Sequence, residues 1–198
     1  MKILGVTGSM GMGKSTVCAL FQQYGFPVFD ADRVVHQIQA PHGKGLKKIE
    51  QTFPGAVKNN ALDRNYLRHL IVQDRNNLKK IEQIILPMVA QEREKFIRLA
   101  QARGIKWCIL DVPLLFEKKI NLLCTKTLVV AAPVNIQKIR ILKRNKITWE
   151  QARVFIDAQI PSRTKCKMAD IVIQTGLSKA HTFFQVKKII RLMQAGQL

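Results

Sequence analysis

The residues best suited to chemistry lie near the start of the chain, in Gly8-Ser9-Met10-Gly11-Met12-Gly13-Lys14-Ser15-Thr16. This segment fits the pattern G-x-x-x-x-G-K-[ST] and follows an apolar run at residues 3–6. Glycines let backbone N–H groups turn inward toward phosphate oxygens, and a following helix points its positive end at the same oxygens. The lysine of such a loop reaches the outer phosphates, and the serine hydroxyl ligates Mg²⁺. The sequence therefore predicts a polyphosphate site that uses Lys14 and Ser15.

Two other interpretations of this segment are a glycine-rich turn with a chance lysine and a dinucleotide-binding loop. The dinucleotide interpretation needs G-x-G-x-x-G, whereas the glycines here run G-x-x-G-x-G. The chance interpretation is disfavoured because a strand-like run precedes the segment and an amphipathic helical pattern follows it.

Carboxylates follow two further strand-like runs. Asp30 and Asp32 come after residues 27–29, and Asp111 ends the run at 107–110. Phosphoryl transfer to a hydroxyl needs a carboxylate that orients the nucleophile and accepts its proton. A carboxylate opposite the phosphate loop can also hold a water on Mg²⁺. The residues alone leave two alternatives open, since Asp32 is equally well placed to cap the next helix and Asp111 to cap a loop.

Two arginines lie on one face of a predicted helix at 135–144, because Arg140 and Arg144 are four residues apart. A guanidinium over a transferring phosphoryl group neutralises developing charge and binds two oxygens at once. The alternative is a solvated basic face in a chain rich in lysine and arginine. Spacing does not separate these interpretations.

Short β-branched runs alternate with helical patterns along the chain, which indicates an α/β fold with a parallel sheet. The predicted strands are 2–7, 27–29, 107–110, 127–131 and 169–173, and the main predicted helices are 14–23, 33–39, 46–53, two within 63–103, 133–143, 148–159 and 178–193. Pro87 is expected to kink the longer helix or to end its first half. Ligands of open α/β sheets bind beyond the carboxyl ends of the strands, where the residues named above would meet.

Composition sets the remaining limits. The 198 residues are 47% hydrophobic, as in a globular domain, and the formal charge of +20 favours anionic partners such as nucleotides, nucleic acid or an acidic membrane surface. A proteome-wide basic bias would give the same charge. The scattered histidines make a zinc site unexpected. The cysteines are also far apart and are expected to be buried thiols of a reducing compartment: Cys18, Cys108, Cys124 and Cys166. Neither a signal peptide nor a membrane span is expected, which predicts a cytoplasmic protein.

Taken together, these pieces resemble the dephospho-CoA kinases, the P-loop kinases of the last step of coenzyme A synthesis. The matching pieces, in order, are residues 5–16, Phe29-Asp30-Ala31-Asp32, Leu62-Asp63-Arg64, Asp111-Val112-Pro113-Leu114-Leu115-Phe116-Glu117, Gln137 to Arg140 with Arg144, Ala158-Gln159, and residues 169–173. The first piece is generic to P-loop proteins. The Asp-Ala-Asp and Val-Pro-Leu-Leu-Phe-Glu pieces are more specific.

The resemblance implies a P-loop NTPase-type fold, with a five-stranded parallel sheet flanked by helices. Residues 1–198 would form one kinase domain with a core at about 1–59, 105–132 and 169–198. The helix-rich stretch at about 60–104 would be an acceptor-binding insertion, and that at about 133–168 would be a lid.

The resemblance also implies roles for individual residues. Asp32 would be the base for the ribose 3′-hydroxyl of dephospho-CoA, with Lys14 and Arg140 as the other catalytic residues. The implied ATP-binding residues are Ser9, Met10, Gly11, Met12, Gly13, Lys14, Ser15, Thr16 and Arg144. The acceptor side would comprise Asp32, Arg64, Pro113, Leu114, Leu115 and Glu117. Ser15 would ligate Mg²⁺, with Asp111 acting through water. ATP and dephospho-CoA would be the partners, without an obligatory protein partner or a membrane.

The chain departs from the family pattern at two points, with Leu86 where His usually precedes the proline and Gln174 where Asn usually follows the last strand. One alternative function is another P-loop small-molecule or nucleoside kinase. A second is a nucleic-acid-binding ATPase or an RNA-associated GTPase. The charge supports the second, but the chain has no N-K-x-D motif or basic–aromatic interleaving, and only 7% of its residues are aromatic.

Overall fold

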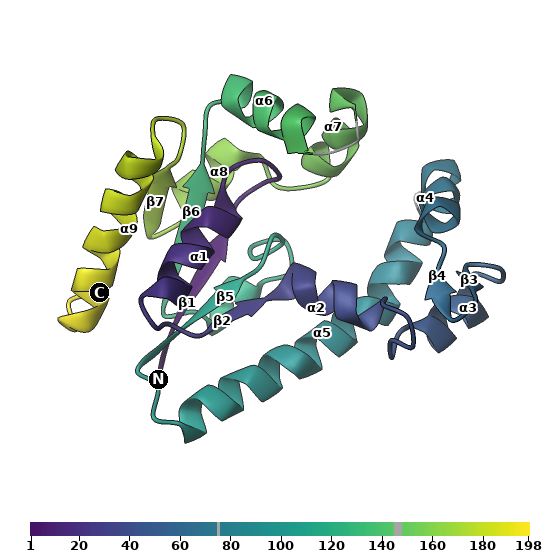
Figure 1. Cartoon of the computed structure of the whole chain (residues 1–198), viewed down its shortest axis with the longest axis horizontal. Helices are drawn as coiled ribbons and strands as arrows, with labels where there is room; N and C mark the ends of the chain where they lie inside the picture. Colours follow the sequence, from purple (N-terminus) through teal and green to yellow (C-terminus); the bar gives the residue numbers. More distant parts are fainter. Residues whose placement is uncertain (75, 145–147) are drawn as a thin grey trace. The chain divides into compact units, whose positions relative to one another are not determined.

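A computed structural model describes residues 1–74, 76–144 and 148–198 of the chain. Its main sheet has five strands in the order β2-β5-β1-β6-β7 (Figure 1). These strands are β1 (Lys2–Thr7), β2 (Val28–Asp30), β5 (Trp107–Asp111), β6 (Lys126–Ala131) and β7 (Ile171–Gln174). The pairs β1–β5, β1–β6 and β6–β7 are parallel. The predicted five-stranded parallel sheet is confirmed, and β1 lies at its centre.

Most predicted helices are present within one to three residues of their expected bounds. They are α1 (Lys14–Gln23), α2 (Ala31–Ile38), α3 (Leu46–Thr52), α4 (Arg64–Gln73), α5 (Asn76–Ala102), α6 (Val134–Arg144), α7 (Trp149–Asp157) and α9 (Lys179–Gln194). The sequence did not predict the hairpin of β3 (Val57–Lys58) and β4 (Ala61–Leu62), the 3₁₀ turn η1 (Ile120–Leu123), or α8 (Ser162–Met168). Pro87 lies inside α5, so the helix does not end there. No described helix is long and apolar enough to cross a membrane.

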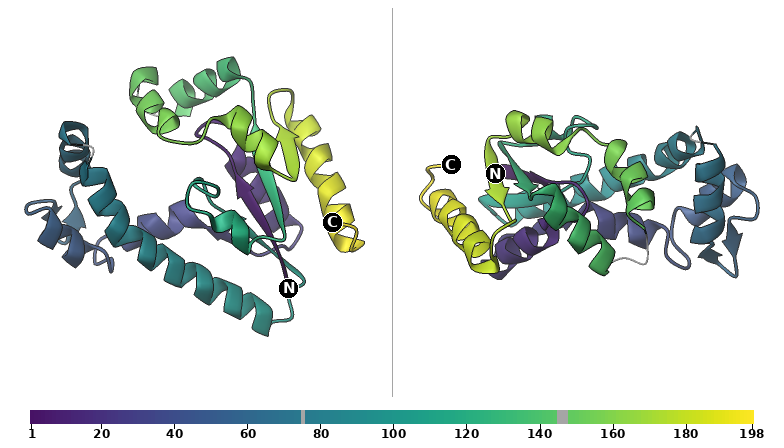
Figure 2. Two further views of the ribbon diagram at one scale, coloured as in Figure 1. Left: turned by 180° about the vertical axis from the view of Figure 1, so that it is seen from behind. Right: turned by 90° about the horizontal axis from the view of Figure 1, so that it is seen from above.

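The two faces of the sheet are covered by different helices. Side chains alternate along a strand, so Leu4 and Val6 of β1 point to one face, where they share a buried cluster with residues of α1 and α9 (Figure 1). Gly5 points to the other face. A Cβ atom at Gly5 would come within 2.6 Å of the Cys124 Sγ and 3.0 Å of a Leu115 methyl carbon. On that face α8 contacts β6 (Figure 2). Burial of both faces explains the continuous apolar runs of the central strands.

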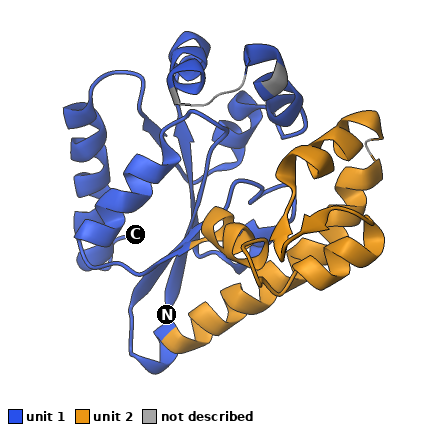
Figure 3. Ribbon diagram, turned by 45° about the vertical axis from the view of Figure 1, so that its right-hand side comes forward, with its two compact units in different colours: residues 1–29, 100–198 blue, residues 30–99 orange. Residues whose placement is uncertain are grey.

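The chain divides into two compact units, which Figure 3 distinguishes by colour. Unit 1 comprises residues 1–29 and 100–198 and holds most of the main sheet. Unit 2 comprises residues 30–99 and holds α2, α3, the β3–β4 hairpin, α4 and most of α5. The boundaries of an acceptor-binding insertion and a lid describe functions, and they stay predictions.

Candidate active site

The segment between β1 and α1 is a loop whose backbone needs glycine at two positions. Gly11 and Gly13 have φ angles of 78° and 93°, in the left-handed region that residues with a Cβ atom rarely adopt. Gly13 is also the N-cap residue of α1. The loop passes close to β6, because a Cβ atom at Gly8 would come within 2.6 Å of the Val130 carbonyl oxygen. The two glycines therefore allow the chain to fold tightly at the end of the central strand.

Donors from two neighbouring segments bind the carbonyl groups of this loop. The Gln137 side-chain amide donates to the Met10 carbonyl at 2.8 Å, and the Thr175 hydroxyl donates to the Met12 carbonyl at 2.6 Å. Both side chains are buried. Because the N–H and C=O groups of a trans peptide point in opposite directions, the next N–H groups, of Gly11 and Gly13, face away from these donors. This arrangement presents backbone amides to an anion, as a phosphate-binding loop requires.

Two residues predicted to bind ATP have buried side chains. Ser9 and Met12 are only 5% and 3% exposed. The Met12 Sδ atom accepts a hydrogen bond from the Ala132 amide, at 3.1 Å, just after β6. Contact between these two residues and a ligand must therefore come from their backbones. Ser15 and Thr16, by contrast, are exposed at the start of α1.

The end of β5 supplies a carboxylate to the loop. Asp111 is paired with Val6 across the β1–β5 ladder, and its carboxylate forms an ion pair with the Lys14 ammonium. The two side chains are 5% and 12% exposed. Parallel pairing of the strands thus brings two of the predicted site residues into direct contact.

The oxygens near this ion pair fit a magnesium ion. Mg²⁺ prefers oxygen ligands and is usually held by one or two protein groups together with substrate phosphates and water. The exposed Ser15 hydroxyl follows Lys14 directly, and the Asp111 carboxylate contacts Lys14. Among the described residues, no group of three or more His, Cys, Asp or Glu side chains forms a metal cluster. This donor set suits Mg²⁺ delivered with a nucleotide.

Helix α6 brings Arg140 to the same loop. Its guanidinium donates to the Thr175 hydroxyl at 2.9 Å, to the Thr175 carbonyl at 2.5 Å and to the Gly11 carbonyl at 3.4 Å. Arg140 therefore lies against the loop, where its N–H groups bind protein oxygens. Arg144 is the last residue of α6, and its side chain lies outside the described part of the chain.

The loop after β5 contains the other predicted acceptor residues of unit 1. The Pro113 carbonyl accepts hydrogen bonds from the Thr7 hydroxyl at 2.9 Å and from the Lys165 ammonium at 3.0 Å. Glu117 forms an ion pair with Lys165 at 2.8 Å. Leu115 is completely buried, so its side chain anchors the loop in the core, whereas Pro113, Leu114 and Glu117 are partly exposed.

Unit 2 carries Asp32 and Arg64. Asp30, and not Asp32, caps α2, because its side chain accepts a hydrogen bond from the Arg33 amide at 2.9 Å. The prediction that Asp32 caps the helix is wrong: β2 runs directly into α2, so Asp32 already lies in the first turn, where it is exposed. The Arg64 guanidinium lies 2.7 Å from the Nδ1 atom of His36. His36 follows Asp32 by one helical turn on α2. Unit 2 thus groups Asp32, His36 and Arg64.

Three of these residues, His36, Lys165 and Thr175, were not identified from the sequence as part of the site, and Gln137 was named only within the matching segment at 137–140. The position of Thr175, directly after the last strand, is a signal that could have identified it, because ligands of this fold bind at strand ends. Lys165 gave no such signal, since it is one of three basic residues at 163–167 and lysines are mostly exposed.

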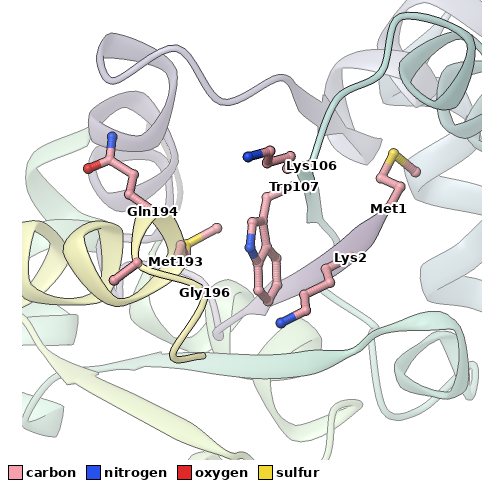
Figure 4. Close-up of a pocket in the computed structure, with 8 residues that line it drawn as sticks. Met1, Lys2, Lys106, Trp107, Met193, Gln194 and Gly196 are labelled. Carbon is pink, nitrogen blue, oxygen red and sulfur yellow. The ribbon is translucent and has the colours of Figure 1, made fainter.

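A cavity of about 440 Å³ lies elsewhere in unit 1 (Figure 4). Lys2 and Trp107, the first residues of β1 and β5, contribute to its lining, together with residues near the end of α9. The Lys2 ammonium lies 5.2 Å from the centre of a Trp107 ring. This cavity is at the opposite ends of β1 and β5 from the phosphate-binding loop, and it is not part of the candidate site.

Comparison with known proteins agrees with this geometry. A family model described as dephospho-CoA kinase matches residues 2–180. A dephospho-CoA kinase of Gluconobacter oxydans is 40% identical over 98% of this chain and 100% of its own. A crystal structure of TT1252 from Thermus thermophilus is 30% identical with a TM-score of 0.81, covering 96% of each chain. A dephospho-CoA kinase structure from Campylobacter jejuni is 26% identical with a TM-score of 0.74, covering 100% of each chain. With nearly its whole length matched by such relatives, this chain belongs to the dephospho-CoA kinase family.

Proposed function

We propose that this chain transfers the γ-phosphoryl group of ATP to the ribose 3′-hydroxyl of dephospho-CoA, giving CoA and ADP. The observation that carries the proposal is the loop between β1 and α1, in a chain of this family. The Gln137 and Thr175 side chains donate hydrogen bonds to its Met10 and Met12 carbonyls. Its Lys14 contacts the Asp111 carboxylate at the end of β5, which neighbours β1 in the sheet. Amides, an ammonium group and oxygen ligands for a metal then surround one position, which suits a nucleotide polyphosphate.

The ATP side of the reaction falls to unit 1. The amides of residues 9–16 and the Lys14 ammonium bind the phosphates, and Arg140 and Arg144 add positive charge from α6. Ser15 would hold Mg²⁺ directly, and Asp111 would hold it through water. When bound, Mg²⁺ neutralises the negative charge that develops on the transferring group and the leaving phosphate. Lys14, next to Asp111, is held at the outer phosphates.

The acceptor side uses Asp32, the Arg64 guanidinium and the loop at 113–117. Asp32 orients the 3′-hydroxyl and accepts its proton as the hydroxyl oxygen bonds to the γ-phosphorus. The bond between that phosphorus and the bridging oxygen breaks at the same time, and ADP leaves. Because Asp30 caps α2, Asp32 is not needed for the cap, which supports its assignment as the base.

The two helix-rich segments of the chain also have proposed roles, one in acceptor binding and one in covering the site. We assign residues 60–104 to acceptor binding and residues 133–168 to a lid that excludes water, a competing acceptor. The four cysteines are thiols, as suits a reducing compartment, and we assign the reaction to the cytoplasm.

A direct test measures ADP release by the full chain with ATP, Mg²⁺ and dephospho-CoA, while mass spectrometry follows the gain of one phosphoryl group on the acceptor. Lys14→Ala is the control, since it removes the ammonium group from the loop. We expect Mg²⁺-dependent release that EDTA abolishes and that adenosine or pantetheine does not support. Release no faster than that of Lys14→Ala, or release only with another acceptor, would contradict the proposal.

A further inference from the structure

Unit 1 contains a lysine that is completely buried and lies outside the phosphate-binding loop. Lys165 of α8 is 0% exposed. Its ammonium group lies 2.8 Å from Glu117 Oε1, donates to the Pro113 carbonyl at 3.0 Å and donates to Gln159 Oε1 at 3.4 Å. An ammonium group is expensive to bury, and here its three protons meet three acceptors.

The three acceptors belong to two segments that are far apart in the chain. Pro113 and Glu117 lie in the loop after β5, whereas Gln159 lies in the connection at 158–161 between α7 and α8. Glu117 Oε1 also accepts a hydrogen bond from the Ile160 amide at 2.9 Å, which ties the same two segments together again. Lys165 is therefore the centre of a polar cluster that fixes the loop against this connection.

Stability alone does not explain this cluster. A buried ion pair contributes little more than two well-packed apolar side chains, because both charges must lose their water. The second Glu117 oxygen, Oε2, is buried and has no hydrogen-bond partner among the described residues. A partly satisfied polar cluster is less favourable than an apolar one. What the cluster does achieve is a fixed direction for the Pro113 carbonyl and the Glu117 side chain.

We propose that Lys165 is a positioning residue for the kinase reaction. Its ammonium group holds the loop at 112–117 in the shape that presents Pro113 and Leu114 to the acceptor. The inference rests on the proposed function, in which this loop binds dephospho-CoA. Lys165 acts through Pro113 and Glu117, so its loss weakens acceptor binding and leaves ATP binding unchanged.

The test compares four variants of the full chain. Lys165→Met removes the ammonium group but leaves a buried carboxylate without its cation, so this variant could unfold. Lys165→Met combined with Glu117→Gln removes both charges, and the amide oxygen can still accept from Ile160. Glu117→Gln alone keeps the ammonium group, and its KM for dephospho-CoA should stay well below that of the double variant, which separates the positioning role from a direct contact of Glu117 with the acceptor. Lys167→Met is the matched control, because Lys167 is exposed on the same helix.

We expect the double variant to melt closer to the parent than Lys165→Met does. Its KM for dephospho-CoA should nevertheless be raised about tenfold or more, while its KM for ATP stays within about twofold. Lys167→Met should match the parent in both constants. If Lys165 contributed only to folding, its loss would not raise KM for dephospho-CoA more than KM for ATP.

Three outcomes would overturn the inference while leaving the proposed function intact: an unchanged acceptor KM in the double variant, an equal rise in both KM values, or the same acceptor KM rise in Lys167→Met. If the parent itself shows no turnover, calorimetric titration with dephospho-CoA decides. Binding that is about tenfold weaker in the double variant would still support the positioning role. A parent that neither turns over nor binds dephospho-CoA would remove the proposed function and this inference with it.

Discussion

The Lys14 ammonium and the Asp111 carboxylate form an ion pair that joins the phosphate-binding loop to the end of β5. Both side chains are almost completely buried, at 12% and 5% exposure, so water screens their attraction only weakly. The pair directs the lysine toward the loop and supplies an oxygen beside the predicted magnesium position. Stability and catalysis should therefore both depend on it.

Replacing Asp111 by Asn keeps the shape of the side chain but leaves the Lys14 charge without its counter-charge. Breaking a buried pair in this way costs about 3–5 kcal/mol of unfolding free energy. We also expect kcat to fall at least about 100-fold, because the loop lysine loses its orientation. Denaturant unfolding and steady-state kinetics measure the two effects. Asp157→Asn, which breaks an exposed pair with Arg153, should change stability by less than about 1 kcal/mol. Equal behaviour of the two variants would contradict the prediction.

Asp32→Asn tests the base directly. The amide cannot accept a proton from the acceptor hydroxyl, so kcat should fall about 10²–10⁴-fold, while ATP affinity measured by calorimetry stays within about threefold. The melting temperature should stay near that of the parent, since Asp30 caps α2. Asp30→Ala should instead lose about 1 kcal/mol of stability through the missing cap. A near-normal kcat in Asp32→Asn would show that another group is the base.

Thr175→Val tests the support behind the phosphate-binding loop. The substitution keeps the shape of the buried side chain and removes the hydroxyl that donates to Met12 and accepts from Arg140. The unpaired Met12 carbonyl should cost about 1–3 kcal/mol, and a looser loop should raise KM for ATP about fivefold or more. Thr52→Val is the control, because Thr52 is exposed on α3 and donates only to its own helix. A KM for ATP equal to that of the control would show that the hydroxyl does not support the loop.

The stability that Asp170 contributes should decrease in acidic solution. Hydrogen bonds from Thr127 lower the pKa of this carboxyl below its ordinary value of 3.8, and the bond from the Thr127 hydroxyl has the largest effect. A lowered pKa in the folded state means that the stabilisation is fully present above pH 3.8 and is lost as pH falls through the lower folded value. The melting-temperature difference between the parent and Asp170→Asn should therefore be constant between about pH 5 and 7 and narrow in more acidic solution. A difference that stays constant in acid would contradict the pKa shift.

The glycine-rich loop between β1 and α1 and the alternation of strands and helices could be predicted because their signals are local. Glycine spacing, the following lysine and serine, and apolar periodicity lie within windows of about ten residues. Asp30 and Asp32 show where local reasoning ends. Both are acceptable helix caps two residues apart, and only the point at which β2 turns into α2 decides between them.

The tertiary structure decided which side chains meet. Arg140 contacts Thr175 and Gly11, which lie 35 and 129 residues away in sequence. Leu115 belongs to the most specific motif of the chain and yet is completely buried. Lys165 is buried against its usual preference because packing of α8 brings the distant loop after β5, with Pro113 and Glu117, to its ammonium group. The sequence by itself determined the family, the order of the elements and the position of the glycine-rich loop that we propose binds phosphate. The hydrogen-bond partners of the remaining polar groups depend on the packing of segments far apart in the chain. No local sequence pattern predicts that packing.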